Sequence, residues 1–109
     1  MSDFKIITEL LVKFRDDRDW KQFHNSKDLA LAISIEAAEL NELFLWKSDE
    51  DVSEVRLKEE LADIFSYAFL LAEKHNLDIL EIIKQKIKLN EMKYSIEKSK
   101  GSAKKYNEL

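Results

Sequence analysis

Apolar side chains recur every three or four residues along most of the chain, which is the spacing of one face of an α-helix. Together with cap residues, this pattern predicts four helices joined by short segments. The predicted helices are residues 3–17, residues from Ser26 or Lys27 to about Trp46, roughly 20 residues ending near His75, and residues from Asp78 to about Tyr94.

Each predicted helix carries its apolar residues on one stripe, which we expect to face the interior. The first helix has the stripe Phe4, Ile7, Leu11 and Phe14. The second has Leu29, Ala32, Ile33, Leu40 and Leu43. The third has Leu57, Leu61, Ile64, Ala68 and Leu71, and the fourth has Ile79, Ile82, Ile83 and Ile87.

The segments between the helices lack this periodicity. RDWKQFHNSKD, at residues 18–28, mixes polar and aromatic side chains, and KSDED, at residues 47–51, forms a turn. Asn76 suits the end of the third helix. Asp78, with Glu81 three residues later, forms a capping-box-like start for the fourth helix.

These elements define an all-α fold. Short connections favour antiparallel neighbours, so we expect a four-helix-bundle-like protomer formed by residues 1–95. Residues 96–109 form a basic polar tail, which we expect to be mobile. A chain of 109 residues is near the size at which one core is only marginally sufficient, so we expect it to pack into a dimer or tetramer.

Composition narrows the class of protein. Hydrophobic residues make up 45% and charged residues 37%, a balance typical of amphipathic helices. The chain has no cysteine, which excludes disulfides and thiolate metal sites. It has no apolar run long enough to span a membrane, and its N-terminus lacks the pattern of a signal peptide. We therefore expect a cytoplasmic protein that has no membrane partner.

Charge is distributed unevenly along the chain. Residues 84–109 carry eight lysines and three glutamates, a net charge of +5, whereas residues 1–83 carry −9. Proteins that bind nucleic-acid polymers show a dominant basic face, so we expect no such partner here. The lysines of the tail could instead provide an anion-binding fringe next to an acidic cation site.

Four acids depart from the amphipathic pattern. Glu36 lies three residues after Ile33 on the inner face of the second helix, and Glu39 follows one turn later. Glu60 lies on the apolar stripe of the third helix, and Asp63 follows at i+3. A carboxylate on an apolar face costs several kcal/mol unless it is paired or metal-bound. No Lys or Arg lies on either stripe at these levels, so the two pairs indicate a hard cation.

Two alternatives weigh against this interpretation. An ExxE or ExxD pair taken singly is common on solvated helix faces, and only the combination of two pairs on consecutive helices is informative. Helical phase also leaves substitutes open, because Glu59 is i−4 to Asp63 and Glu42 is i+3 to Glu39.

The ligand types favour one group of metals. Di-iron bundles use Glu-x-x-His pairs, whereas here no histidine follows the acids at i+3. Ligation by carboxylates alone selects Mg²⁺, with Mn²⁺ as a substitute, over iron or zinc. Sites of this kind keep several waters and bind substrate phosphates, which points to phosphoryl chemistry.

The motifs EAAE, at residues 36–39, and EELAD, at residues 59–63, resemble those of the MazG-like all-alpha nucleoside triphosphate pyrophosphohydrolases. The segments RDWKQFH, ELNELFLWKSD and KLNEMKY are similar to the dCTP pyrophosphatase branch, and GSAKKYNEL is similar to tails of small bacterial members. The resemblance extends from Asp19 to the C-terminus.

Roles follow from this resemblance position by position. It implies metal ligation by Glu36, Glu39, Glu60 and Asp63. It implies a base pocket lined by the segment with Trp20, Phe23 and His24 and flanked by Trp46. It implies contacts to sugar and phosphates from Lys47, Tyr67, Asn90, Lys93 and Tyr94. The family also forms dimers or tetramers in which neighbouring subunits complete each pocket.

Some of these roles can be interpreted without the family. Trp20, Phe23 and Trp46 lie at the ends of helical segments, where stacking on a base is worth roughly 1–3 kcal/mol, although subunit packing is the alternative for Phe23. His24 could equally be a surface histidine. Tyr67 is i+4 from Asp63, so its hydroxyl could reach the phosphates, or it could be a hydrogen-bonded core tyrosine.

We therefore expect a Mg²⁺-dependent hydrolase that converts a nucleoside triphosphate, dCTP or a related pyrimidine deoxynucleotide first, to the monophosphate and pyrophosphate. Glu39 is the acid we expect nearest the attacking water, and Lys93 would neutralise the departing pyrophosphate. The rival hypothesis is a non-catalytic helical oligomer or interaction module that binds a structural cation. A phosphohydrolase acting on dUTP or a diphosphate is the other alternative.

Overall fold

The computed structural model describes residues 2–109, and its regular elements are all helical, which confirms the all-α fold class. The helices are α1 (Asp3–Asp17), α2 (Ser26–Phe44), α3 (Glu54–Lys74), α4 (Ile79–Lys93) and α5 (Ile96–Ser99). Short 3₁₀ turns are η1 (Lys21–Phe23), η2 (Asp49–Asp51) and η3 (Tyr106–Glu108). The chain divides into two compact units, Met1–Leu77 and Asp78–Leu109, which are described separately.

Side-chain caps explain where the long helices begin. The Asn25 amide oxygen accepts a hydrogen bond from the Asp28 backbone N–H at 2.8 Å, so α2 starts at Ser26. The Asp78 carboxylate accepts a bond from the Glu81 N–H at 3.1 Å, which confirms the predicted start of α4. Ser53 caps α3 in the same way.

The end of α3 is set by a left-handed residue. Asn76 has φ of 55°, and the Leu77 N–H donates back to the Ala72 carbonyl at 2.9 Å. This arrangement satisfies carbonyls at the end of the helix that would otherwise lack partners, and it confirms the predicted stop. Helix α2 ends at Phe44, slightly before the predicted Trp46. Trp46 instead lies in a tight turn with φ of 62°.

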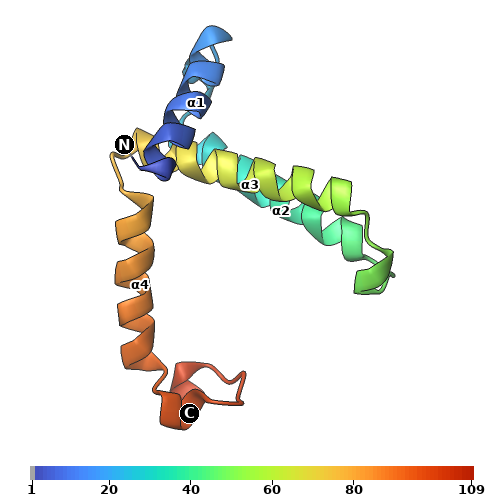
Figure 1. The fold of residues 1–109 in the computed structure, drawn as a ribbon, viewed down its shortest axis with the longest axis vertical. Coiled ribbons are helices and arrows are strands. Elements are labelled where there is room, and N and C mark those ends of the chain that lie inside the picture. The colour runs from blue at the N-terminus through green and yellow to red at the C-terminus, as the bar shows by residue number, and fades with distance from the viewer. Residues whose placement is uncertain (1) are drawn as a thin grey trace. The chain divides into compact units, whose positions relative to one another are not determined.

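In the first unit, α2 and α3 run side by side as a helical hairpin, and α1 packs against α3 (Figure 1). The buried apolar residues are Leu29, Leu43, Leu70 and Ala72. Leu29 and Leu43 belong to the predicted stripe of α2. Phe4 of α1 meets Phe69 of α3 edge-to-face, with ring centroids 5.9 Å apart, so aromatic contacts help to fix α1. This hairpin carries the acids described below.

Much of the predicted interior is exposed in the single chain. Every residue of α4 except Ile79 is exposed, including the predicted stripe positions Ile82, Ile83 and Ile87. On α3, the predicted Leu61 is exposed, whereas the core is formed by Leu70 and Ala72. The sequence predicts that all four stripes face the interior. At Leu61, Ile82, Ile83 and Ile87, however, no other part of the described chain covers the side chain. Apolar surface on this scale is typical of an interface.

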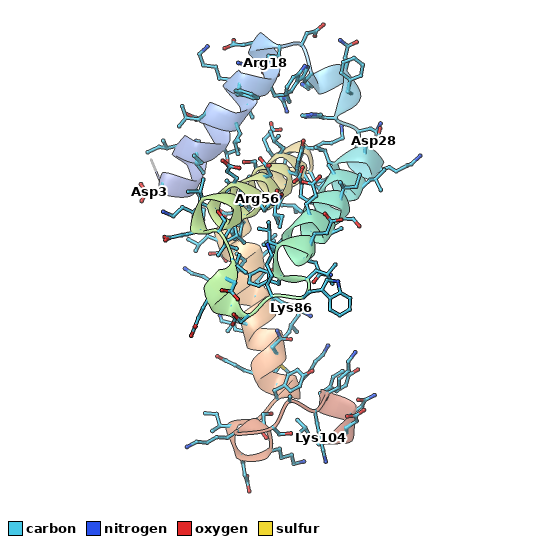
Figure 2. All side chains as sticks on the ribbon, turned by 90° about the vertical axis from the view of Figure 1, so that its right-hand side faces the viewer. Asp3, Arg18, Asp28, Arg56, Lys86 and Lys104 are labelled. Carbon is cyan, nitrogen blue, oxygen red and sulfur yellow. The ribbon has the colours of Figure 1, made fainter. Side chains whose placement is uncertain are left out.

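The second unit contains α4, α5 and η3. Residues 96–109, the predicted tail, include the one-turn helix α5 and the 3₁₀ turn η3, and their mobility stays a prediction. The Tyr106 ring meets Tyr94 edge-to-face at 6.1 Å, and the Lys93 ammonium lies 4.9 Å from the centre of the Tyr106 ring. These contacts hold the segment against the end of α4. Figure 2 shows the lysine side chains of this unit, among them Lys86 and Lys104.

Among residues 2–109, none of the helices combines the length and the hydropathy needed to cross a bilayer.

Candidate metal centre and adjoining cavity

Three of the four predicted acids lie together in the α2–α3 hairpin. Glu36 lies midway along α2, and Glu60 and Asp63 lie one turn apart on the facing part of α3. One carboxylate oxygen from each lies within 4.8 Å of the other two, so a single cation could contact all three. Glu36 and Glu60 are half-buried, and Asp63 is exposed. The site is therefore open on the Asp63 side.

The electrostatics of this cluster favour a cation. The Oε2 atoms of Glu36 and Glu60 are buried without a hydrogen-bond partner among the described residues. Burial, followed by hydrogen bonding to Glu39 and Glu60, raises the pKa of the Glu36 carboxyl to about 7. Two unsatisfied carboxylate oxygens and a carboxyl that resists ionisation are the signature of like charges held together. Carboxylate-only ligation fits a hard divalent cation.

Glu39 lies beside this group but outside it. It is exposed, and it is not one of the three acids that share the 4.8 Å cluster. Its carboxylate nevertheless contributes to the raised pKa of Glu36, so the two carboxylates are neighbours. The substitutes that helical phase left open, Glu42 and Glu59, are exposed and lie outside the cluster.

A cavity of about 390 Å³ adjoins the acids, between α1, the 18–25 connector and α3. The connector runs from Arg18 at the end of α1 to the start of α2 near Asp28 (Figure 2). Asp63 belongs both to the acid cluster and to the wall of the cavity. The lining residues are Leu11, Phe14, Arg15, Trp20, His24, Asp63, Ser66, Tyr67 and Leu70. A cavity of this size suits a small ring system.

The cavity brings together three residues predicted for substrate binding. Trp20 packs edge-to-face on Phe14, with centroids 5.7 Å apart, and is 43% exposed, so part of its surface is free to stack. His24 meets Tyr67 edge-to-face at 6.4 Å. Burial and then the charges of Glu36, Asp63 and Glu39 raise the pKa of the Tyr67 hydroxyl. Tyr67 therefore keeps its proton and can donate a hydrogen bond near the acids.

His24 is held in its neutral form. Burial, followed by the positive charge of Arg15, lowers the pKa of its imidazole. Its Nδ1 atom is buried and has no hydrogen-bond partner within the described chain. A neutral imidazole offers one donor and one acceptor, which is the chemistry needed to read the edge of a base.

Other predicted substrate residues do not line this cavity. Phe23 is 62% exposed on η1, and Trp46 is 94% exposed in the turn after α2. Trp46 and Lys47 follow the end of α2 at Phe44, eight residues or about 12 Å along the helix beyond Glu36. Asn90, Lys93 and Tyr94 belong to the second unit, at the end of α4, which is not placed relative to the acids.

Sequence reasoning missed several cavity residues. Leu11 and Phe14 were predicted as core, whereas Arg15, Ser66 and Leu70 were not singled out. These residues lie on α1 and α3, and they come together only because α1 packs against α3. The periodicity of the sequence does not reveal this packing. The available signal was Arg15 itself, a cation directly after an apolar stripe, with an acid at Asp16 beside it.

Comparison with known proteins relates most of the chain to one family. Residues 31–109 match the family described as MazG-like. The chain is 37% identical to dCTP pyrophosphatase 1 of Mus musculus over 111 residues, which cover 94% of this chain and 65% of the mouse protein. The Bos taurus protein of the same name is 38% identical, over 94% of this chain and 66% of its own length. The chain thus spans about two thirds of these relatives.

A solved structure extends the similarity to the fold. The crystal structure of a pyrophosphatase from Archaeoglobus fulgidus DSM 4304 matches with a TM-score of 0.79 and 36% sequence identity. The match covers 87% of this chain and 94% of the archaeal one, so the helical arrangement is shared over nearly the whole of both.

Proposed function

The chain belongs to the MazG-like family, and from this premise we propose that it is a Mg²⁺-dependent nucleotide pyrophosphohydrolase. It would cleave a nucleoside triphosphate to the monophosphate and pyrophosphate. One observation carries the proposal: the cluster of Glu36, Glu60 and Asp63 opens through Asp63 into a cavity large enough for a base. A cation site and a ring-binding cavity that share a residue suit a substrate with a phosphate chain at one end and a ring at the other.

Glu36, Glu60 and Asp63 would hold the metal, with Glu39 as the fourth carboxylate. The two buried carboxylate oxygens without hydrogen-bond partners support this assignment. All four proposed ligands are carboxylates, with no cysteine or histidine among them, and this favours Mg²⁺, with Mn²⁺ as a substitute. When bound, the metal would neutralise phosphate charge and polarise the phosphorus under attack.

Two side chains, Glu39 and Tyr67, would carry out the other steps of the reaction. Glu39, which is exposed beside the cluster, would orient a water in line with the α-phosphorus and accept its proton. The new bond joins the water oxygen to phosphorus, and the bond from phosphorus to the bridging oxygen breaks, so that pyrophosphate leaves with the bonding electrons. Tyr67, kept protonated by burial and neighbouring acids, would donate a hydrogen bond to a phosphate oxygen.

We propose a pyrimidine deoxynucleotide, dCTP first, as the substrate. The relatives named dCTP pyrophosphatase 1 support this choice. The cavity supports a small base, with Trp20 as the stacking surface and His24 as the polar edge. Stacking tolerates every base, so selectivity would come from cavity size and hydrogen bonding.

The same proposal includes an oligomer. A four-helix-bundle-like protomer would pack into a dimer or tetramer and cover the exposed apolar faces. In this oligomer, the predicted substrate-binding residues that do not line the cavity would contact the substrate bound to a neighbouring copy of the chain. These residues are Phe23, Trp46, Lys47, Asn90, Lys93 and Tyr94. The full exposure of Trp46 supports this role, because a tryptophan in water without a partner is costly.

A product assay tests the proposal. Purified protein with Mg²⁺ would be incubated with each of the four dNTPs, dUTP, the NTPs and dCDP, and the products would be separated. We expect pyrophosphate and the monophosphate, with dCTP having the highest kcat/KM. Release of orthophosphate would contradict the bond assigned here, and a preference for purines would contradict the base assignment. Nucleotide binding without turnover would favour the non-catalytic alternative.

A further inference from the structure

A second cavity lies next to the one proposed for the base, and the proposed chemistry does not use it. It has a volume of about 200 Å³ and lies between the end of α1, η1 and the end of α3. Ligand pockets for drug-sized molecules measure roughly 300–1,000 Å³, so this cavity suits a small ion with its waters better than a nucleotide. Its lining residues are Arg15, Lys21, His24, Leu29, Leu70, Glu73, Lys74 and Asn76.

The lining of this cavity is positively charged. Three cationic side chains, Arg15, Lys21 and Lys74, line it. Glu73 is the one carboxylate of the lining, so three cations and one anion leave a net charge of +2. Neither lysine forms an ion pair within residues 2–109. An anion in the cavity would therefore supply the charge that these two ammonium groups lack.

Arg15 gives the cavity a fixed donor group. It is the one charged residue that is buried in the described chain, with 5% of its surface exposed. Its Nε donates to Asp16 at 2.9 Å, and its Nη1 donates to Glu73 at 3.3 Å, so both carboxylates orient the guanidinium. A guanidinium has five N–H donors, and no acceptor within residues 2–109 bonds to Nη2. An oriented guanidinium with unused donors is well suited to bind an oxyanion.

The position of the cavity separates it from the acid cluster. Glu73 follows Asp63 by ten residues on α3, which corresponds to about 15 Å along the helix. Without a metal the acid cluster repels anions, whereas the cavity attracts them. Anion binding at the cavity therefore needs no cation.

We propose that this cavity is a binding site for a small oxyanion of the phosphate class, held by Arg15, Lys21 and Lys74. The ion is free orthophosphate or pyrophosphate, or the phosphate group of a nucleotide, since all three present the same oxygens. The three cations belong to α1, η1 and α3, so the bound ion joins these elements. Arg15, His24 and Leu70 also line the base cavity, and the ion thereby stabilises the wall that the two cavities share.

A phosphate titration tests the site in the presence of EDTA, with chloride keeping the ionic strength constant. The backbone amide signals of the full chain are followed by NMR. We expect saturable shifts at residues 21–24 and 73–76, and a higher melting temperature with phosphate. Lys21→Gln and Lys74→Gln should each raise the Kd for phosphate roughly two- to fivefold, since each removes a partly solvated charge. Lys5→Gln is the matched control, because Lys5 is an exposed lysine of α1 outside the cavity, and it should bind like wild type.

Arg15→Lys tests the contribution of the guanidinium. It keeps the charge but loses the planar group with several donors, so the Kd should rise more than in either lysine variant. If this variant does not fold, the two lysine variants still decide.

Two results would overturn the proposal. One is a wild-type response that does not saturate or that spreads over the lysines of both units. The other is an equal Kd for the wild type and both lysine variants. Pyrophosphate and dCMP are titrated in the same way to identify the source of the oxyanion. Shifts with the inorganic ions alone identify a free ion, and shifts of the same amides with dCMP identify a nucleotide phosphate; either supports the site. If no nucleotide is hydrolysed, the proposed function fails while the titration still decides the oxyanion site.

Discussion

Glu36 lies where burial and neighbouring acids both oppose ionisation of its carboxyl group. Its pKa is raised from the ordinary 4.5 to about 7. Between these two pH values the folded chain therefore holds a proton on this carboxyl group that the unfolded chain releases. The stability contributed by this protonated carboxyl is present below pH 4.5 and is lost as pH rises through 7. A bound cation would replace the proton.

We therefore predict that millimolar Mg²⁺ raises the melting temperature of the wild type, and by more at pH 8 than at pH 6, because at pH 6 the metal competes with the proton. Glu36→Gln should blunt the increase at both pH values, and Asp63→Asn should do the same. Thermal unfolding with and without Mg²⁺ measures this. The matched control is Glu42→Gln, an exposed acid of the same helix, which should respond like wild type. No Mg²⁺ response in the wild type would count against the cation site.

The aromatic and imidazole side chains should have separable effects on substrate. Trp46→Ala should raise KM across all nucleotides, because stacking lacks base selectivity, and the loss of roughly 1–3 kcal/mol corresponds to at least several-fold. His24→Ala should mainly reduce discrimination among bases, since it removes the polar edge. Steady-state kinetics with the four dNTPs measure both. The assignment is wrong if His24→Ala weakens every nucleotide equally and Trp46→Ala has no effect.

Some residues of the site could be predicted from the sequence and others could not. Glu36, Glu60 and Asp63 were found because a carboxylate on an apolar stripe violates the amphipathic pattern. Arg15 was missed because its burial arises only when α1 crosses α3 and brings Glu73 within 3.3 Å, far from it along the chain. A pattern of neighbouring positions carries no information about such a pair.

Among the elements, the α2–α3 hairpin holds the acids, and its geometry depends on where each helix begins. We predict that Asn25→Ala destabilises the fold by about 1 kcal/mol, because the Asp28 N–H loses its acceptor. Asn25→Ser keeps an acceptor for the Asp28 N–H and, unlike Asn25→Asp, places no second carboxylate beside that of Asp28, to which the Asn25 amide donates at 2.8 Å, so it should cost only a fraction of that. Urea unfolding of the two variants measures the difference. Equal free energies of unfolding for wild type and Asn25→Ala would show that the cap contributes nothing.

The four long helices were predictable, because caps and apolar periodicity are local properties. The observed α2 is shorter than predicted since Trp46 adopts a left-handed turn, for which the sequence offers no glycine as a warning. The contacts of Tyr106 with Lys93 and Tyr94 were not predicted for a related reason, because they join positions more than ten residues apart. The cavity was not predicted either, because its walls form only when α1 packs against α3.

For the whole molecule, the small core and the exposed stripes argue for association. Four residues form the buried apolar core of the described chain, whereas Ile83 and Ile87 on α4 are 49% and 52% exposed. We predict a dimer or tetramer at micromolar concentration, since the apolar faces would otherwise remain in water. Light scattering gives the mass directly, and a monomer would refute the prediction.

A pair of variants tests whether α4 takes part. Ile87→Lys introduces a charge on the apolar stripe and should lower the mass or weaken association, because burying an unpaired charge is costly. Gln85→Lys introduces the same charge at an exposed polar position of the same helix and should leave the mass unchanged. If both variants keep the wild-type mass, the α4 stripe is not part of the interface.

In the proposed function, the four acids hold the cation that supports cleavage at the α-phosphorus. The most direct test is the rate of pyrophosphate release from dCTP, measured as a function of Mg²⁺ concentration for wild type, Glu36→Gln and Glu39→Gln. We expect Mg²⁺-dependent release by wild type, and for Glu36→Gln a demand for more Mg²⁺. For Glu39→Gln we expect a kcat lower by roughly 10²–10⁴-fold with KM nearly unchanged. If the wild type releases no pyrophosphate from any triphosphate with Mg²⁺ or Mn²⁺, or if both variants match it, the account is contradicted.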